Sequence, residues 1–280
     1  MRAFSSITLV VVAGALALGA GACSSSDTDP ANTGGSGNSG GSGNTGGNGA
    51  GGAGAGGAGC SEPGEVVCAD QVILQLNLQS DVTPGLVENE AEGAGWISTI
   101  DATAGGAFTA DPTSYTYGRF TEQGLVKVEI SDEQSLESMD WDIAFRRYVI
   151  RINSGNSGPS CVTATPIPGD PAYDEVTAVP ETLPQFRTDE YFTAGCELIN
   201  DGSGLESSPA TALAGYYTYP GCVAMSDRTF IVETAEGRRL KLTVSDYYFP
   251  DVQEQCDTMS TLPLTSTGSA NFRVRWAFLP

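Results

Sequence analysis

The stretch TFIVETAEGRRLKLTV, residues 229–244, decides the fold class. Its first part, 229–234, and its last part, 239–244, alternate apolar and polar side chains, which is typical of half-buried β-strands. The short connection 235–238 contains Gly237, and a glycine in so short a connection predicts a β-hairpin. The sequence therefore predicts an antiparallel hairpin in the C-terminal third of the chain.

The sequence on both sides of this hairpin continues the β pattern. Residues 271–279 (NFRVRWAFL) alternate large apolar and polar side chains and predict a half-buried antiparallel strand. Residues 141–153 (WDIAFRRYVIRIN) change face once, at Arg146-Arg147, which predicts a bulge or a sharp bend. Shorter strands are expected at 72–78, 96–100, 114–120 and 125–130.

Few segments favour helix. Residues 131–139 are expected to form at most one or two helical turns, because Ser131 and Gln134 have the spacing of a capping box. The proline-punctuated stretch 159–209 has no long periodic run and is expected to be loop, with one short helix or strand near 186–192. The predicted fold class is therefore all-β: an antiparallel β-sheet domain with long proline-rich loops and at most short helices.

The N-terminus has the pattern of an export signal. A single arginine precedes an apolar run at 7–18 (ITLVVVAGALAL), which is too short to span a membrane. Small residues then precede Cys23, and this arrangement resembles a bacterial lipobox, although Ala20 stands where such motifs usually carry leucine. We expect residues 1–22 to be a signal peptide and Cys23 to be lipidated. The alternative is ordinary cleavage after Ala22, which would leave a free secreted protein.

The residues after Cys23 predict a tether. Residues 23–59 are rich in glycine, serine and asparagine and cannot bury enough apolar surface to offset chain entropy, so they are expected to be disordered. Residues 60–280 are expected to form one folded domain. Ser24, by resemblance to lipoprotein sorting signals, favours the outer membrane. The protein is therefore expected to be an outer-membrane lipoprotein, bound to the membrane through its N-terminal lipid and exposed at the cell surface or facing the periplasm.

The formal net charge of the chain is −21 at pH 7. A nucleic-acid-binding surface needs a basic patch, so nucleic acid is not expected as a partner. The acidity is consistent with high solubility and does not by itself indicate a ligand.

The cysteines predict disulfide bonds. The chain has seven cysteines, and setting Cys23 aside leaves an even number in the exported domain. A metal site is disfavoured, because no histidine is present to complete it. Proximity along the chain favours the pairs Cys60–Cys68, Cys161–Cys196 and Cys222–Cys256. The last pair would close the open end of the hairpin, with the run 251–255 as a loop.

The absence of histidine removes much enzyme chemistry. Neither a Ser-His-Asp triad, nor a Cys-His pair, nor an HExxH zinc site can be built. Asp140 and Asp142 flank Trp141 and are candidates for a hydrolytic carboxylate pair. With 34 acidic residues in the chain, however, such pairs arise by chance, and we do not expect an enzyme.

Four segments follow one another in a recognisable order. They are WDIAFRR at 141–147 with the Asn-Ser-Gly turn after it, the tyrosines Tyr216, Tyr217 and Tyr219, the hairpin at 229–237, and FRVRW at 272–276. Together they resemble landmarks of the HmuY family, and the resemblance covers about residues 113–280. This family comprises outer-membrane or secreted lipoproteins with an all-β fold that capture haem. The resemblance therefore implies a surface-exposed binding module, with haem or another porphyrin as ligand and an outer-membrane receptor as partner.

The best-known members of that family hold haem iron between two histidines, and this chain has none. Because related haem carriers use methionine, the resemblance makes Met225, just before the hairpin, and Met139, beside Trp141, candidate haem ligands. Tyr217 is a candidate to ligate or to stack on a porphyrin. The alternative roles are gap filling for the methionines and cross-strand packing for the tyrosine. A structural or adhesive surface lipoprotein with the same fold and no small ligand is the second functional hypothesis.

Overall fold

The computed structural model describes residues 59–103, 113–205 and 207–280. The predicted signal peptide at 1–22, Cys23 and the tether up to residue 58 lie outside the described residues, so export and lipidation stay predictions. Within the described ranges, no helix is long and apolar enough to cross a membrane.

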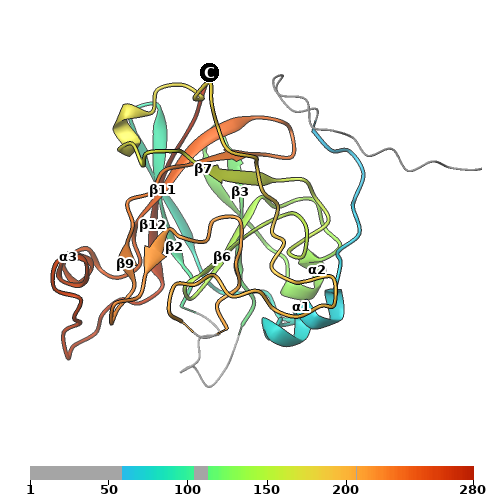
Figure 1. Cartoon of the computed structure of the whole chain (residues 1–280), viewed down its shortest axis with the longest axis horizontal. Coiled ribbons are helices and arrows are strands. Elements are labelled where there is room, and N and C mark those ends of the chain that lie inside the picture. The colour runs from blue at the N-terminus through green and yellow to red at the C-terminus, as the bar shows by residue number, and fades with distance from the viewer. Residues whose placement is uncertain (1–58, 104–112, 206) are drawn as a thin grey trace, which may run out of the picture. The chain divides into compact units, whose positions relative to one another are not determined.

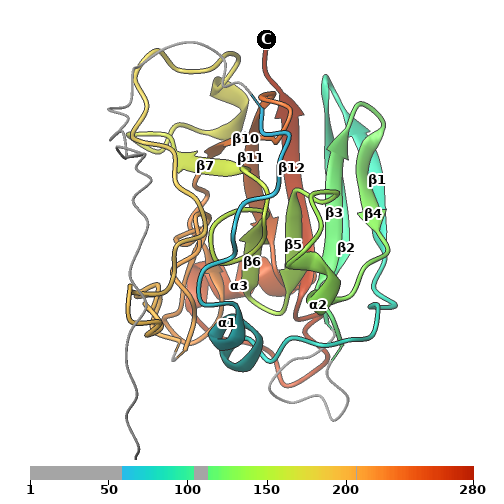
Figure 2. The ribbon, with the colours of Figure 1, turned by 90° about the vertical axis from the view of Figure 1, so that its right-hand side faces the viewer.

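Two antiparallel sheets form the body of the domain (Figures 1 and 2). The strands of the larger sheet are β1 (Val87–Glu92), β2 (Gly95–Asp101), β7 (Thr163–Pro166), β10 (Phe230–Glu233), β11 (Arg239–Asp246) and β12 (Asn271–Phe278). Those of the smaller sheet are β3 (Thr116–Thr121), β4 (Gly124–Val128), β5 (Ile143–Arg146) and β6 (Val149–Ile152). Their spatial orders are β1-β2-β12-β11-β10-β7 and β4-β3-β5-β6. A separate ribbon pairs β8 (Tyr217–Thr218) with β9 (Ala224–Met225). The all-β prediction is confirmed.

The main hydrophobic core lies between the two sheets and takes side chains from both. Strand β12 shows how this happens: its alternate residues Phe272, Val274 and Trp276 are fully buried, as the sequence pattern predicts. The Trp276 ring packs edge-on against Phe120 of β3, with 4.8 Å between ring centroids. Phe272 packs at 5.3 Å against Phe145 of β5. The predicted hairpin is also confirmed, because β10 pairs antiparallel with β11.

The change of face within 141–153 is a hairpin turn. Strands β5 and β6 pair antiparallel, with Arg146 opposite Val149, so that only Arg147 and Tyr148 lie in the connection. Arg147 has a φ of 51°, in the left-handed region that tight β-turns use. The predicted sharp bend is therefore a complete reversal of the chain.

A second hydrophobic cluster lies on the other side of the smaller sheet. Residues 72–78 contribute to this cluster, and the strand predicted for them is wrong. The structure has the helix α1 (Ala69–Gln75) there. Val72 and Leu76, four residues apart, are buried in this cluster, whereas Leu74 between them is exposed. A short apolar run fits strand and helix equally well, and only the surface against which it packs distinguishes them.

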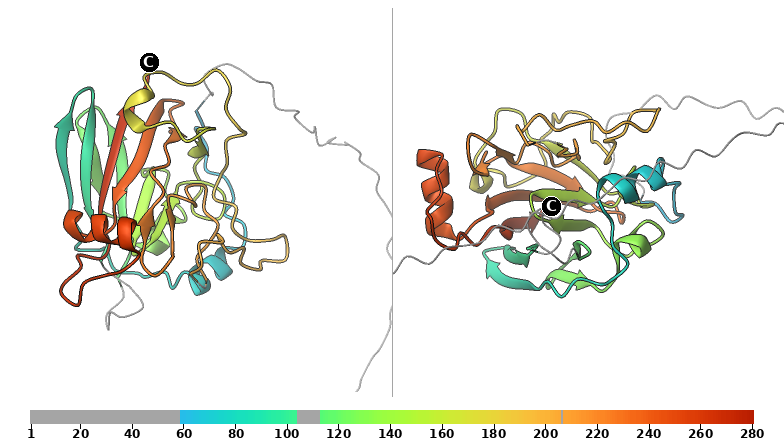
Figure 3. Two further views of the ribbon diagram at one scale, coloured as in Figure 1. Left: turned by 60° about the vertical axis from the view of Figure 1, so that its left-hand side comes forward. Right: turned by 90° about the horizontal axis from the view of Figure 1, so that it is seen from below.

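For the two remaining α-helices, one sequence prediction is confirmed and the other is wrong. Helix α2 (Asp132–Ser135) begins at the predicted capping box, in which Ser131 and Gln134 each bond the other's backbone N–H. The predicted loop at 251–255 is wrong, because α3 (Pro250–Met259) occupies it. Its first residue is proline, which favours the first turn of a helix, and this start signal was present in the sequence. Figures 1 and 3 show α3 at the side of the sheets.

Besides β8 and β9 of the separate ribbon, two strands of the larger sheet were not expected. Strand β1 is almost wholly exposed and carries three glutamates, so it has no apolar alternation to reveal it. Strand β7 lies in the proline-punctuated stretch, which also contains the 3-10 helix η1 (Tyr173–Glu175). The region near 186–192 forms only isolated bridges, such as that between Ala164 and Arg187.

The disulfide pairing differs from the expected one in two of three bonds. Cys222–Cys256 is confirmed, with a Cα–Cα distance of 6.0 Å. The other bonds are Cys60–Cys161 and Cys68–Cys196, so the predicted pairs of near neighbours are wrong. The N-terminal segment runs along the domain instead of folding on itself, and the Gly64 N–H donates to the Pro159 carbonyl at 2.6 Å. Tertiary placement, rather than closeness in sequence, therefore decides these two bonds.

Candidate functional site

The β8–β9 ribbon brings two of the three predicted ligand residues together. Tyr217 and Met225 are direct antiparallel partners. Opposed residues in such a pair present their side chains on the same face. Tyr217 is almost fully buried, whereas Met225 is only partly buried, and both pack on the core between the sheets. Met225 is thus the more accessible of the two.

Aromatic rings gather around this pair. The ring centroids of Tyr216 and Tyr217 are 4.7 Å apart, and those of Tyr148 and Tyr217 are 6.4 Å apart. The Tyr216 hydroxyl donates to the Tyr148 carbonyl at 2.6 Å, which ties β8 to the β5–β6 turn. Tyr247 and Tyr248, which follow β11, pack edge to face at 4.8 Å beside them. We call Tyr148, Tyr216, Tyr217, Tyr247 and Tyr248 the tyrosine cluster.

The hydroxyl of Tyr217 is already engaged inside the protein. It lies 2.9 Å from the Ser203 hydroxyl and 3.2 Å from a carboxylate oxygen of Asp201. Burial raises the pKa of Tyr217 to about 12, because it disfavours the charged phenolate. These contacts favour a packing role for Tyr217 over ligation of iron through its oxygen.

Strand β9 is held rigidly against α3. The N–H of Met225 donates to Asp257 at 2.8 Å, and the side-chain amide of Gln253 donates to the Val223 carbonyl at 3.0 Å. The disulfide between Cys222 and Cys256 joins the same two segments covalently. Met225 is therefore presented from a fixed backbone, which is what a preorganised ligand position requires.

Met139 lies in a different part of the domain. It follows α2, and Figure 1 shows α2 and β9 on opposite sides of the molecule. Its neighbour Asp140 lies 3.8 Å from Arg119, which in turn pairs with Glu236 in the β10–β11 turn. Met225 precedes the opposite, open end of that hairpin. The structure therefore does not bring the two methionines to one iron.

Arg147 is a residue of this region that the sequence did not single out. It lies next to Tyr148 in the β5–β6 turn and is half-buried. Burial raises the pKa of Tyr148, Tyr247 and Tyr248, and the positive charge of Arg147 opposes that rise in each. The sequence signal that could have identified Arg147 was its position at the face change of WDIAFRRY. A tight turn between two buried strands projects its side chains beyond the sheet.

The two aspartates considered for hydrolysis are in unlike environments. Asp140 is exposed, whereas Asp142 is 2% exposed and accepts a hydrogen bond from the Phe120 N–H at 2.8 Å. Burial raises the pKa of Asp142 to about 7. Asp142 thus fastens β3 to the start of β5. Among the described residues, no group of three or more Cys, Asp or Glu side chains is placed to hold a metal ion.

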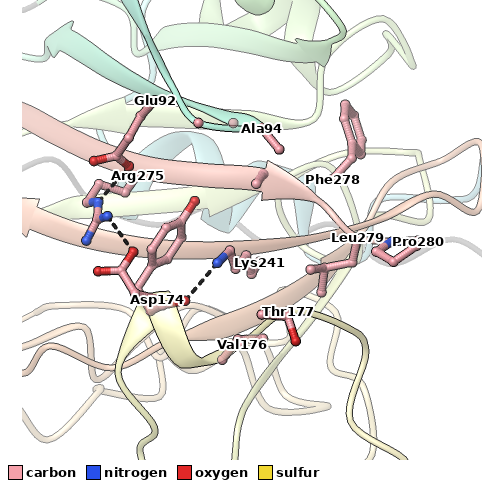
Figure 4. Close-up of a pocket in the computed structure, with 14 residues that line it drawn as sticks. Glu92, Ala94, Asp174, Val176, Thr177, Lys241, Arg275, Phe278, Leu279 and Pro280 are labelled. Atoms are coloured by element: carbon pink, nitrogen blue, oxygen red, sulfur yellow. Dashed lines mark hydrogen bonds and ion pairs between the residues drawn. The ribbon is translucent and has the colours of Figure 1, made fainter.

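A cavity of about 370 Å³ lies away from the tyrosine cluster, between the β1–β2 turn, η1 and the end of β12 (Figure 4). Arg275 donates to Glu92 and to Asp174, each at 2.8 Å. Lys241 donates to the Tyr173 carbonyl at 2.8 Å, and both cations lie over the Tyr173 ring. None of the predicted ligand residues lines this cavity.

No curated protein matches the chain. Among solved structures, an HmuY-like protein from Bacteroides vulgatus ATCC 8482 is 16% identical, with a TM-score of 0.39, and the match covers 65% of this chain and 90% of that one. A protein from Bacteroides fragilis NCTC 9343 that is named a lipoprotein is 12% identical, with a TM-score of 0.40 and coverage of 67% and 90%. The apo form of an HmuY analogue from Tannerella forsythia is 16% identical, with a TM-score of 0.34 and coverage of 70% and 98%.

The family comparison is more specific. The model described as HmuY protein matches residues 111–258, which is more than half of the chain. The matched range includes the WDIAF strand, the β8–β9 ribbon, the hairpin and most of α3. On this match, the chain belongs to the HmuY family.

Proposed function

We propose that this protein is a surface-exposed lipoprotein binding module that captures haem or another porphyrin at the β8–β9 ribbon. The observation that carries the proposal is the direct pairing of Met225 with Tyr217 beside the tyrosine cluster. Membership of the HmuY family supports it, and one of the structural neighbours is named as a haem-binding protein. We propose a binding function and not an enzymatic one.

The chemistry of the site fits a flat ligand with a central iron. Of the tyrosine cluster only Tyr148 is more than 3% exposed, and its ring offers an apolar face on which a planar macrocycle packs. The thioether of methionine is a soft, neutral ligand that haem iron accepts in several protein classes. Met225 is partly exposed on a strand that is hydrogen-bonded to α3, so part of its side chain faces solvent while the ribbon stays folded. With no histidine in the chain, Met225 is the residue of this site that would hold the iron.

A second candidate function is that of a structural or adhesive surface lipoprotein without a small ligand. The burial of Tyr216 and Tyr217 and the engaged hydroxyl of Tyr217 favour it. In this alternative the tyrosine cluster is only core packing, and loss of the Met225 thioether changes no binding property.

The test is a hemin titration of the purified domain, followed by visible absorption. We expect a saturable Soret shift at micromolar concentrations in the wild type. Met225→Ala should abolish the shift, because it removes the iron ligand. Met139→Ala is the matched control and should behave like the wild type, since Met139 lies elsewhere in the fold. A wild type that causes no spectral change, or a Met225→Ala variant that retains it, would refute methionine-ligated haem capture.

A further inference from the structure

The cavity of about 370 Å³ beside η1 contains a cation without a carboxylate partner (Figure 4). Lys241 lines this cavity and is partly buried, and its amine donates one hydrogen bond, to the Tyr173 carbonyl at 2.8 Å. Among the described residues Lys241 forms no ion pair, whereas Lys127, the other lysine of the chain, pairs with Glu129 at 3.0 Å. An ammonium group has three donors, so Lys241 can bind an incoming acceptor without giving up its contact with Tyr173.

The carboxylates of this cavity are engaged by a different cation. Arg275 donates to Glu92 and to Asp174, each at 2.8 Å (Figure 4). The Arg275 guanidinium lies 4.4 Å and the Lys241 amine 3.9 Å from the centroid of the Tyr173 ring. Burial lowers the pKa of Lys241, and the charges of Asp174 and Glu92 do not fully offset this. An additional negative charge beside Lys241 would therefore stabilise its charged form.

The wall of the cavity near the end of β12 is apolar. Phe278 and Leu279 line the cavity and are partly exposed, and Pro280 beside them is exposed. Val176 and Ala277 also line it but are almost fully buried, so they add little contact surface. The volume is near the lower end of the range of ~300–1,000 Å³ that is usual for small-molecule sites, so a single ring or a short carbon chain fits.

The charges around Lys241 define which anion fits. A carboxylate accepts short, charge-assisted hydrogen bonds from an ammonium group. A phosphate dianion would bring a second negative charge towards Glu92 and Asp174, and only one cation of the cavity is unpaired. The combination of one unpaired cation, two engaged carboxylates and an apolar wall therefore selects a small monocarboxylate with a compact apolar body.

We propose that the cavity between the β1–β2 turn, η1 and the end of β12 is a further binding site, which takes a small apolar monocarboxylate, and that Lys241 binds its carboxylate. Neither Met225 nor any residue of the tyrosine cluster lines this cavity. The inference is therefore independent of the porphyrin-binding function proposed for the β8–β9 ribbon.

The experiment follows fluorine NMR of 4-(trifluoromethyl)benzoate and of the matching amide, 4-(trifluoromethyl)benzamide, with the purified full chain. The two probes share the ring and differ in charge. The wild type should bind the acid with a Kd of about 1 mM or tighter, and about tenfold more tightly than the amide, because one charge-assisted contact distinguishes them. Lys241→Gln should remove this preference, and Lys241→Arg should keep most of it. Lys127→Gln removes the other lysine and is the charge-matched control.

A second measurement needs no variant. The chain has two lysines, so acetylation of each by acetic anhydride can be followed by mass spectrometry of the wild type. The benzoate should slow the acetylation of Lys241 and leave that of Lys127 unchanged, whereas the benzamide should protect neither. Equal affinity of the wild type for acid and amide, an acid preference that survives Lys241→Gln, or equal protection of both lysines would overturn the inference.

Discussion

Met225 and Tyr217 lie directly opposite each other across the β8–β9 ribbon, yet their environments differ. The tyrosine is 2% exposed and hydrogen-bonded through its hydroxyl, whereas the methionine is only partly buried. The two residues therefore have different roles: Tyr217 anchors the ribbon to the core, and Met225 presents a side chain at the surface.

If Tyr217 only anchors the ribbon, Tyr217→Phe should lower the stability of the domain without changing its hemin spectrum. The variant keeps the ring but removes the hydroxyl that contacts Ser203 and Asp201. We expect a loss of about 1–3 kcal/mol in the free energy of unfolding, because polar partners lose a contact in a largely buried place. The hemin spectrum at saturation should match that of the wild type. A spectrum altered as strongly as that of Met225→Ala would show that the tyrosine oxygen binds iron.

The disulfide Cys222–Cys256 should stabilise the domain and the position of β9. The bond closes a loop with a sequence separation of 34, and both cysteines are fully buried. In the loop-entropy model, the double variant Cys222→Ser/Cys256→Ser should lose about 3–4 kcal/mol of unfolding free energy in denaturant titrations. Limited proteolysis should also cut faster near α3. Unchanged stability together with an unchanged cleavage pattern would contradict this role.

The buried ion pair Arg146–Asp132 should be far more sensitive to mutation than the surface pairs. Both side chains are nearly inaccessible, and Asp132 also accepts the N–H of Tyr115 at 2.7 Å. Arg146→Met would leave a buried carboxylate without its cation, at a cost of about 3–5 kcal/mol. The matched control is Arg228→Met, which breaks the exposed pair with Asp170 and should cost about 1 kcal/mol or less. Similar melting temperatures for the two variants would count against this assignment.

Asp142 should make the domain less stable as the pH rises. Burial raises its pKa from 3.8 to about 7, with Glu236 adding to the rise and with the Phe120 N–H and Arg119 opposing it. The folded state thus binds the proton more tightly than the unfolded chain does. Its contribution to stability is therefore present below about pH 4 and is lost as the pH rises through about 7. Asp142→Asn, which mimics the neutral form, should remove this loss.

The measurement for Asp142 is the melting temperature of wild type and Asp142→Asn between pH 5 and pH 8. The variant should gain relative to the wild type at the alkaline end, by at least about 1 kcal/mol or roughly 2–4 °C. Other titrating groups affect both proteins equally, so the difference isolates Asp142. Parallel pH profiles would show that the carboxylate is charged throughout.

Anchoring is predicted to depend on Cys23, which lies outside the described residues. In cells, Cys23→Ser should move the protein from the membrane fraction to the soluble fraction, because the lipid acceptor is lost. Ser24→Ala keeps the cysteine and serves as the control. Unchanged fractionation of Cys23→Ser would refute lipid anchoring at this position.

The sequence by itself determined the elements whose signals are local. The alternation of apolar and polar side chains in β11 and β12 follows from the requirement that one face of a strand be buried and the other not. The capping box at Ser131 and the landmarks of the HmuY family were likewise readable, since both depend on residues a few positions apart. The same is true of Met225 and Tyr217 as candidates, although not of their pairing.

Only the tertiary structure decided what depends on distant partners. The run at 72–78 became helix because its buried residues meet the second hydrophobic cluster at helical spacing. Cys60 and Cys68 bond with residues 101 and 128 positions away, because the N-terminal segment lies along the domain. The separation of Met139 from Met225 arises in the same way. Contacts between segments far apart in sequence leave no periodic pattern within either segment, so only packing of the whole chain reveals them.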